Sequence, residues 1–148
     1  MRISLEQALD ILMDHVTHGK TERKTLEDCL GLVLSEDVYA LLDMPPFSRS
    51  AQDGYAFQAK DSAGASKEQP VELKVTGKIY AGDFSEAEVK PGEAIRIMTG
   101  AMIPVGADCV LRQEDTDEGE DAVRIYKEVE PGCSICFKGE EYKKGHIL

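Results

Sequence analysis

The sequence predicts an α+β protein that is mostly β, with a small helical and extended lobe and an inserted β-rich, barrel-like domain. Three observations predict this class: an amphipathic helical repeat near the N-terminus, short apolar segments between Pro/Gly turns further on, and the dipeptide Pro45-Pro46 between the two regions. Hydrophobic residues make up 42% of the 148 residues and charged residues 30%. That composition is typical of a folded domain with a core.

The N-terminal segment predicts a single helix with a clear start. Ser4 and Gln7 have the spacing of a capping box, in which each side chain satisfies the backbone N–H of the other residue. Apolar residues then recur at helical spacing: Leu5, Ala8, Leu9, Leu12, Met13 and Val16. We expect Gly19 to end this helix in a left-handed cap. One or two helical turns are expected over 25–31, and the β-branched and aromatic content of 32–40 predicts a strand.

Beyond Pro45-Pro46 the pattern changes to short strands at regular intervals. Apolar segments that follow or precede Pro/Gly turns lie at 71–75, 94–98, 109–111 and 123–126. This pattern is typical of a β barrel or sandwich. We therefore divide the chain into a discontinuous lobe, 1–43 plus 132–148, and an inserted β-rich domain, 44–131.

Charge and apolar runs exclude several classes of partner. With 17 Lys and Arg against 28 Asp and Glu, the net charge is −11, which is unfavourable for binding nucleic acid phosphates. No apolar run reaches the length of a membrane span, and no signal-peptide pattern begins the chain. We expect a cytoplasmic protein with reduced cysteines. The acidic run over 114–121 is interpreted as a solvated loop rather than a cation site.

Two segments carry residues suited to chemistry. In the first, 44–56, Asp53-Gly54 favours a tight turn that would display the carboxylate. In the second, 95–108, a strand runs into Thr99-Gly100, which would present a hydroxyl and backbone N–H groups to an anionic ligand. No Gly-rich phosphate loop and no complete catalytic set is present in the sequence. This chain would therefore supply only part of a reaction site.

Several ordered motifs together resemble one family. They are Pro45-Pro46-Phe47, Ser50-Ala51-x-Asp53-Gly54-Tyr55-Ala56, Arg96-Ile97-Met98-Thr99-Gly100-Ala101, Pro104-x-Gly106-Ala107-Asp108 and Gln113-Glu114-Asp115-Thr116. The chain resembles the MoeA family of molybdopterin molybdenumtransferases, which includes the gephyrin E domain, over essentially its whole length. The resemblance implies the N-terminal and linker region of such an enzyme, with the molybdopterin-binding domain expected after Leu148.

The resemblance also implies a function. Family members insert molybdenum from molybdate into adenylylated molybdopterin, with Mg²⁺, and act as homodimers; their pathway partners are molybdopterin adenylyltransferase and the molybdoenzymes. Carried onto this sequence, Asp53 and Thr99 are the expected catalytic residues, and Ser50 and Gly100 are the expected cofactor-binding residues. No metal ligand is assigned, and no cofactor is expected to bind this chain tightly.

Two other interpretations remain open from the sequence. A non-catalytic β-rich dimerisation or adaptor module is favoured if Asp53 and Thr99 lie apart or are buried in turn hydrogen bonds, whereas a shared position on a cleft-facing rim favours the transferase. A thiol redox or zinc protein would use Cys133-x-x-Cys136. Because the chain is acidic and its sequence predicts no basic pocket, we expect it to have no turnover by itself.

Overall fold

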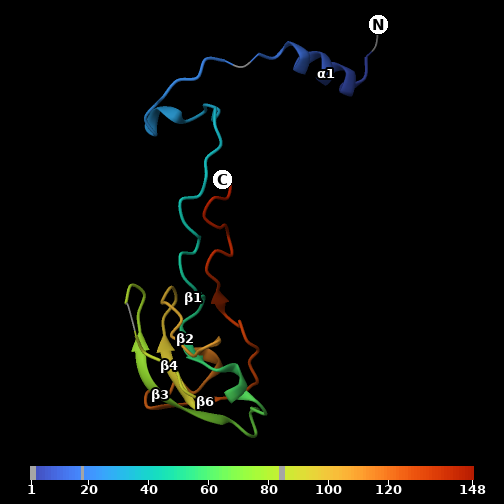
Figure 1. The fold of residues 1–148 in the computed structure, drawn as a ribbon. Helices are drawn as coiled ribbons and strands as arrows, with labels where there is room; N and C mark the ends of the chain where they lie inside the picture. The colour runs from blue at the N-terminus through green and yellow to red at the C-terminus, as the bar shows by residue number, and fades with distance from the viewer. Residues whose placement is uncertain (1–2, 18, 84–85) are drawn as a thin grey trace. The chain divides into compact units, whose positions relative to one another are not determined.

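The computed structural model describes residues 3–17, 19–83 and 86–148 and divides the chain into two compact units (Figure 1). The smaller unit is Met1–Asp37 and the larger is Val38–Leu148. Most of the regular structure is β, with one α-helix and three short 3-10 helices, so the predicted α+β, mostly β class is confirmed. Within the described residues, no helix has both the length and the apolar content that crossing a bilayer requires.

The smaller unit contains helix α1, Leu5–His15, and its start follows the prediction. The Ser4 hydroxyl accepts the backbone N–H of Gln7 at 3.2 Å, and the Gln7 side chain accepts that of Ser4 at 3.0 Å. A 3-10 turn, η1, follows at Glu27–Cys29, and Gly31 closes it with a φ of +81°. None of the residues in α1 is buried, so its apolar stripe is exposed.

Two predictions for this part of the chain are wrong. The helix does not extend to a left-handed cap at Gly19: it ends at His15, and Val16 is already extended. The strand predicted over 32–40 is reduced to one isolated bridge between Tyr39 and Ile147. A strand needs a neighbour along its length and a surface to pack against, and residues 32–34 are exposed.

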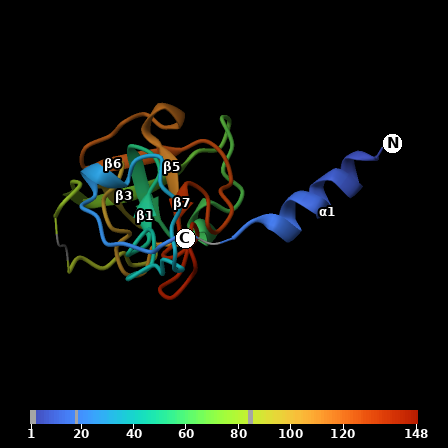
Figure 2. The same ribbon diagram turned by 90° about the horizontal axis from the view of Figure 1, so that it is seen from above.

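The larger unit is built on a five-stranded sheet that curls as a half-barrel (Figure 1; Figure 2). Its strand order is β5-β2-β4-β3-β6. The strands are β2 Gly54–Phe57, β3 Val71–Ile79, β4 Glu93–Ile97, β5 Cys109–Arg112 and β6 Ala122–Ile125. The β3–β4 pair is parallel and the other pairs are antiparallel. All four apolar segments predicted as strands are strands.

Alternation along these strands creates two apolar clusters, one on each side of the sheet. One cluster includes Tyr55, Phe57, Leu73, Ala94, Leu111, Val123 and Ile125. The other includes Ala56, Ile79, Val89, Ile95, Ile97 and Val110. Burying a side chain of this size contributes about 1.5–3 kcal/mol, so the two-sided burial of the central strands stabilises the whole sheet.

Strand β2 was not predicted, because Asp53-Gly54 was interpreted as a tight turn. Gly54 instead starts the strand, with a backbone that lies against the adjacent strand β5. The Leu111 carbonyl oxygen occupies the place that a Cβ at this position would need. Glycine is therefore required at this position by a close approach of two backbones.

Two short ladders join distant parts of the larger unit. Strands β1, Arg49–Ser50, and β7, Ile135–Cys136, form a small antiparallel sheet. The extended chain near Ala40 runs beside the C-terminal residues, where its N–H donates to the His146 carbonyl at 2.8 Å (Figure 1). The division into a discontinuous lobe, 1–43 plus 132–148, and an inserted domain, 44–131, stays a prediction.

Short 3-10 turns complete the larger unit. They are η2 at Ala59–Ser62 and η3 at Gln113–Asp115. The acidic run over 114–121 begins in η3 and forms the connection from β5 to β6. Asp115 in this run forms ion pairs with Arg112 and Lys127. The Asp117 carboxylate accepts the Arg124 backbone N–H at 2.9 Å, which holds this connection against β6.

Candidate functional site

Asp53 and Thr99 lie at one edge of the five-stranded sheet. Asp53 directly precedes β2, and Thr99 follows β4 by two residues. The two strands are antiparallel with Gly54 opposite Ile97, so the start of β2 meets the end of β4. This register brings together two side chains that are 46 residues apart in the sequence.

The two side chains are bonded directly. Oδ1 of Asp53 accepts the Thr99 hydroxyl at 2.6 Å and the Thr99 backbone N–H at 2.7 Å. These two hydrogen bonds favour the ionised carboxylate and lower the pKa of Asp53 below its usual value, with a smaller contribution from the positive charge of Arg96. Asp53 is half-buried and Thr99 is exposed, so the pair lies at the surface of the unit.

Both Thr99 donors that were expected to face an anionic ligand are directed to Asp53 instead. The carboxylate takes the place of the anion at the end of β4. Its second oxygen, Oδ2, makes no hydrogen bond within the described residues, because both Thr99 donors meet Oδ1. The pair thus presents an ionised carboxylate whose Oδ2 is not bonded to Thr99.

Ser50 and Gly100 pair with each other beside this site. The Gly100 N–H donates to the Ser50 carbonyl at 2.9 Å, and the Ser50 N–H donates to the Ala101 carbonyl at 2.9 Å. The Ser50 side chain is buried, and its hydroxyl donates to the Gln52 carbonyl at 2.5 Å. These donors therefore fix the loop path that carries Asp53.

Arg96 and Gln113 connect to Asp53, although the sequence analysis gave neither of them a role. Nη2 of Arg96 donates to Oε1 of Gln113 at 2.8 Å, and the Gln113 backbone N–H donates to the Asp53 carbonyl at 3.0 Å. The Arg96 guanidinium also lies 5.6 Å from the centroid of the Tyr55 ring. The alternation of β4 was a usable signal, because Ile95 and Ile97 face one apolar cluster and Arg96 must face the other side.

The four cysteines are unpaired thiols in the structure. Cys133 is exposed and Cys136 is half-buried, while burial of Cys109 raises the pKa of its thiol to about 12. Among the described residues, no three His, Cys, Asp or Glu side chains are grouped closely enough to hold a metal ion. The zinc interpretation of Cys133 and Cys136 gains no further ligand from the fold.

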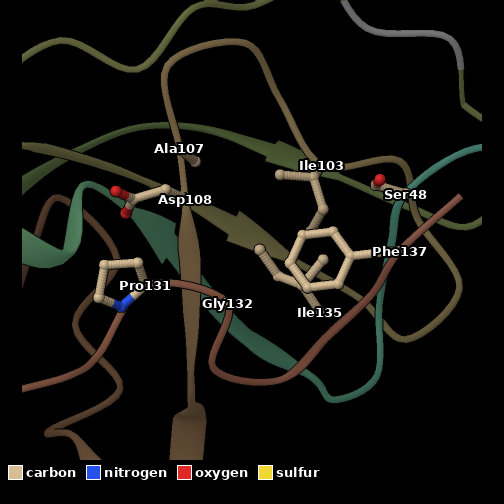
Figure 3. Close-up of a pocket in the computed structure, with 8 residues that line it drawn as sticks. All are labelled: Ser48, Ile103, Ala107, Asp108, Pro131, Gly132, Ile135 and Phe137. Carbon is tan, nitrogen blue, oxygen red and sulfur yellow. The ribbon is translucent and has the colours of Figure 1, made fainter. Parts of the chain in front are cut away.

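A separate apolar cavity of about 430 Å³ is shown in Figure 3. Ile103, Ile135 and Phe137 form its apolar wall, and Ser48 lies beside them. Asp108 borders it, with a carboxylate that accepts the Ala59 N–H at 2.6 Å. None of the four expected site residues lines this cavity, which makes it structurally distinct from the Asp53–Thr99 pair.

Comparisons with known proteins agree with the motifs. The family model described as "MoeA N-terminal region (domain I and II)" matches residues 3–148. The molybdopterin molybdenumtransferase of Staphylococcus epidermidis is 40% identical over 146 residues, and that of Bacillus subtilis is 39% identical over 150 residues. Each alignment covers 99% of this chain and 35% of the relative, so the chain spans about a third of the length of these relatives.

The fold agrees as well. The crystal structure of the molybdopterin biosynthesis moeA protein from Pyrococcus horikoshii OT3 superposes with a TM-score of 0.86 at 39% sequence identity. The match covers 97% of this chain and 38% of that protein. By sequence and by fold, this chain belongs to the MoeA N-terminal region family.

Proposed function

We propose that this chain is the N-terminal region of a molybdopterin molybdenumtransferase, which inserts molybdenum from molybdate into adenylylated molybdopterin. The observation that carries the proposal is the direct pairing of Asp53 with Thr99 at the edge of the sheet. The two residues lie together and are not buried, since Asp53 is half-buried and Thr99 is exposed, and this supports the transferase over a non-catalytic adaptor. The full reaction would also need groups that bind the pterin and molybdate. The rest of the enzyme would supply these groups.

The role proposed for Asp53 follows from its surroundings. Thr99 lowers the pKa of the Asp53 carboxylate and fixes its orientation through Oδ1, which leaves Oδ2 to act on the reacting groups. Thr99 would act as a positioning residue, because its hydroxyl and N–H both hold the carboxylate. Ser50 and Gly100 would position the loop through their backbone bonds rather than bind the cofactor with them.

This chain would contribute one carboxylate to a Mg²⁺ site shared with the substrate. Magnesium in proteins is commonly held by one or two carboxylates together with substrate phosphates. Asp53 is the carboxylate that this chain would offer, and Oδ2 is the atom free to do so. When bound, the ion would neutralise charge on the phosphate oxygens of the substrate.

The proposal also includes a homodimer in the cytoplasm, in which Asp53 and Thr99 of one protomer border the reaction site of the other. Exposed apolar side chains along α1 are consistent with a second polypeptide covering them. The expected pathway partners are molybdopterin adenylyltransferase, which would supply the substrate, and the molybdoenzymes, which would receive the product.

The proposal is tested by comparing the 148-residue chain with its full-length parent. Each is supplied with molybdate, Mg²⁺ and adenylylated molybdopterin, and the release of AMP and the transfer of molybdenum are measured. Turnover is expected from the parent alone. Turnover by the 148-residue chain, or none by a folded parent, would contradict the proposal.

A further inference from the structure

A second cavity, of about 370 Å³, lies where strand β3 bulges beside β4. Val75 pairs with Ala94 and Lys78 pairs with Arg96, so β3 has one residue more than β4 between these two pairs. The residues that line the cavity are Val75, Thr76, Gly77, Lys78, Arg96 and Glu120. The bulge thus places two cationic side chains at one hollow.

Arg96 forms no direct ion pair within the described residues. Its Nη1 and Nη2 donate to uncharged groups, the Tyr55 hydroxyl at 3.4 Å and the Gln113 side-chain oxygen at 2.8 Å. Its Nε is buried and makes no hydrogen bond. In the described parts of the chain, no carboxylate lies within 4.0 Å of its guanidinium. A partly buried cation with no carboxylate in direct contact and an unpaired Nε is unfavourable, and an anion in the cavity would relieve this cost.

Lys78 adds a second positive charge. Its ammonium lies 5.0 Å from the Tyr80 ring centroid, and it forms none of the ion pairs found among the described residues. Glu120, from the connection before β6, is the carboxylate that lines the same cavity. Among the residues that line the cavity, two cations stand against one carboxylate, in a chain of net charge −11.

We propose that this cavity binds the phosphate group of a small molecule. A guanidinium presents several N–H donors in a plane and matches the oxygens of a phosphate, and an ammonium reinforces the attraction. The cavity is near the lower end of the size range of small-molecule sites. Glu120 would repel a ligand with further negative groups, so the site favours a single phosphate over a polyphosphate. Asp53 and Thr99 do not line this cavity, and the site does not depend on the proposed transferase activity.

The test is a titration of the 148-residue chain with inorganic phosphate at constant ionic strength. Binding is monitored through the backbone amide chemical shifts in NMR spectra. Saturable shifts are expected at Thr76, Gly77 and Lys78. A parallel titration with glycerol 3-phosphate separates the two sources of the group: tighter binding than phosphate assigns a phosphate ester, and equal binding assigns the free ion.

Matched variants decide whether the cavity is responsible. Lys78→Gln should weaken binding about tenfold, as expected for the loss of one charge-assisted contact. Lys74→Gln removes the same charge from an exposed position on the same strand, outside the cavity, and should leave affinity within about twofold. Glu120→Gln should tighten binding because it removes the repelling carboxylate.

Two results would overturn the proposal. One is the absence of saturable shifts around the bulge. The other is equal weakening by Lys78→Gln and Lys74→Gln, which would show that phosphate responds only to net charge. If Lys78→Gln does not fold, Arg96→Lys keeps the charge and removes the planar donors. That variant should weaken binding, and unchanged affinity would count against the site.

Discussion

The Asp53 carboxylate accepts both donors of Thr99 through one oxygen, the hydroxyl at 2.6 Å and the backbone N–H at 2.7 Å. A carboxylate held in this way is oriented by the sheet edge, because its partner is fixed by the end of β4 and its own backbone by the start of β2. The bonds also stabilise its charge. The same contact therefore orients the Asp53 carboxylate and lowers its pKa.

Removing the Thr99 hydroxyl should raise the pKa of Asp53. Thr99→Val keeps the shape and the backbone N–H but loses the largest of the contributions that lower this pKa. The pKa is measured by following the Asp53 carboxyl carbon in an NMR titration of the 148-residue chain. Thr76→Val, on β3, is the matched control and should leave it unchanged. An unshifted Asp53 in Thr99→Val would show that the hydroxyl does not bind the carboxylate in solution.

The same pair should make stability depend on acidity. Because its pKa is lowered on folding, Asp53 contributes stability that is present above its unfolded pKa of about 4 and is lost as pH falls through the folded value. Urea unfolding at several pH values should show a smaller acid-induced loss in Asp53→Asn than in the wild-type chain. Equal losses in the two proteins would mean that the carboxylate is not stabilised by folding.

Gly54→Ala should destabilise the larger unit strongly. The Leu111 carbonyl oxygen of β5 stands where the new methyl group would lie, and both atoms belong to rigid, buried strands. We expect a loss of about 3 kcal/mol or more in the free energy of unfolding, measured by urea denaturation. Gly77→Ala is the control, because no atom lies within 4 Å of its added methyl group and its φ is not positive. If both variants lose the same stability, β2 and β5 do not approach as described.

Thiol labelling should separate the cysteines by burial. Cys109 is buried and its pKa is raised to about 12, so almost none of it is thiolate near neutral pH. Iodoacetamide at pH 8 should label the exposed Cys29 and Cys133 in the folded chain and leave Cys109 unmodified until denaturant is added. Peptide mass spectrometry gives the extent at each site. Labelling of Cys109 at the rate of Cys133 would contradict its position in the core.

The sequence was informative where a structure depends on local patterns. The capping box at Ser4 and the alternating strand over 71–75 follow from neighbouring residues, and both predictions are confirmed. The strand expected over 32–40 fails because strand formation needs a partner that propensity does not supply. Gly54 was misinterpreted for a related reason: its requirement comes from Leu111, a residue of another strand.

The site shows the same division between local and distant information. Motifs marked Asp53 and Thr99, but their bond depends on the β2–β4 register, which no short pattern specifies. Ser50 and Gly100 were expected to bind a cofactor, whereas their donors meet other parts of the loop. The lack of a direct ion pair at Arg96 could be recognised only after its hydrogen-bond partners were known to be the uncharged groups of Tyr55 and Gln113.

Turnover by the full-length parent carrying Asp53→Asn is the measurement that tests the proposed role of this chain most directly. The amide keeps the shape and the Oδ1 acceptor but removes the charge, so molybdenum insertion should fall at least about tenfold while the protein stays folded and dimeric. Asp121→Asn makes the same change at an exposed position outside the site and should leave turnover intact. Unchanged turnover in Asp53→Asn would contradict the assignment of this carboxylate to the reaction.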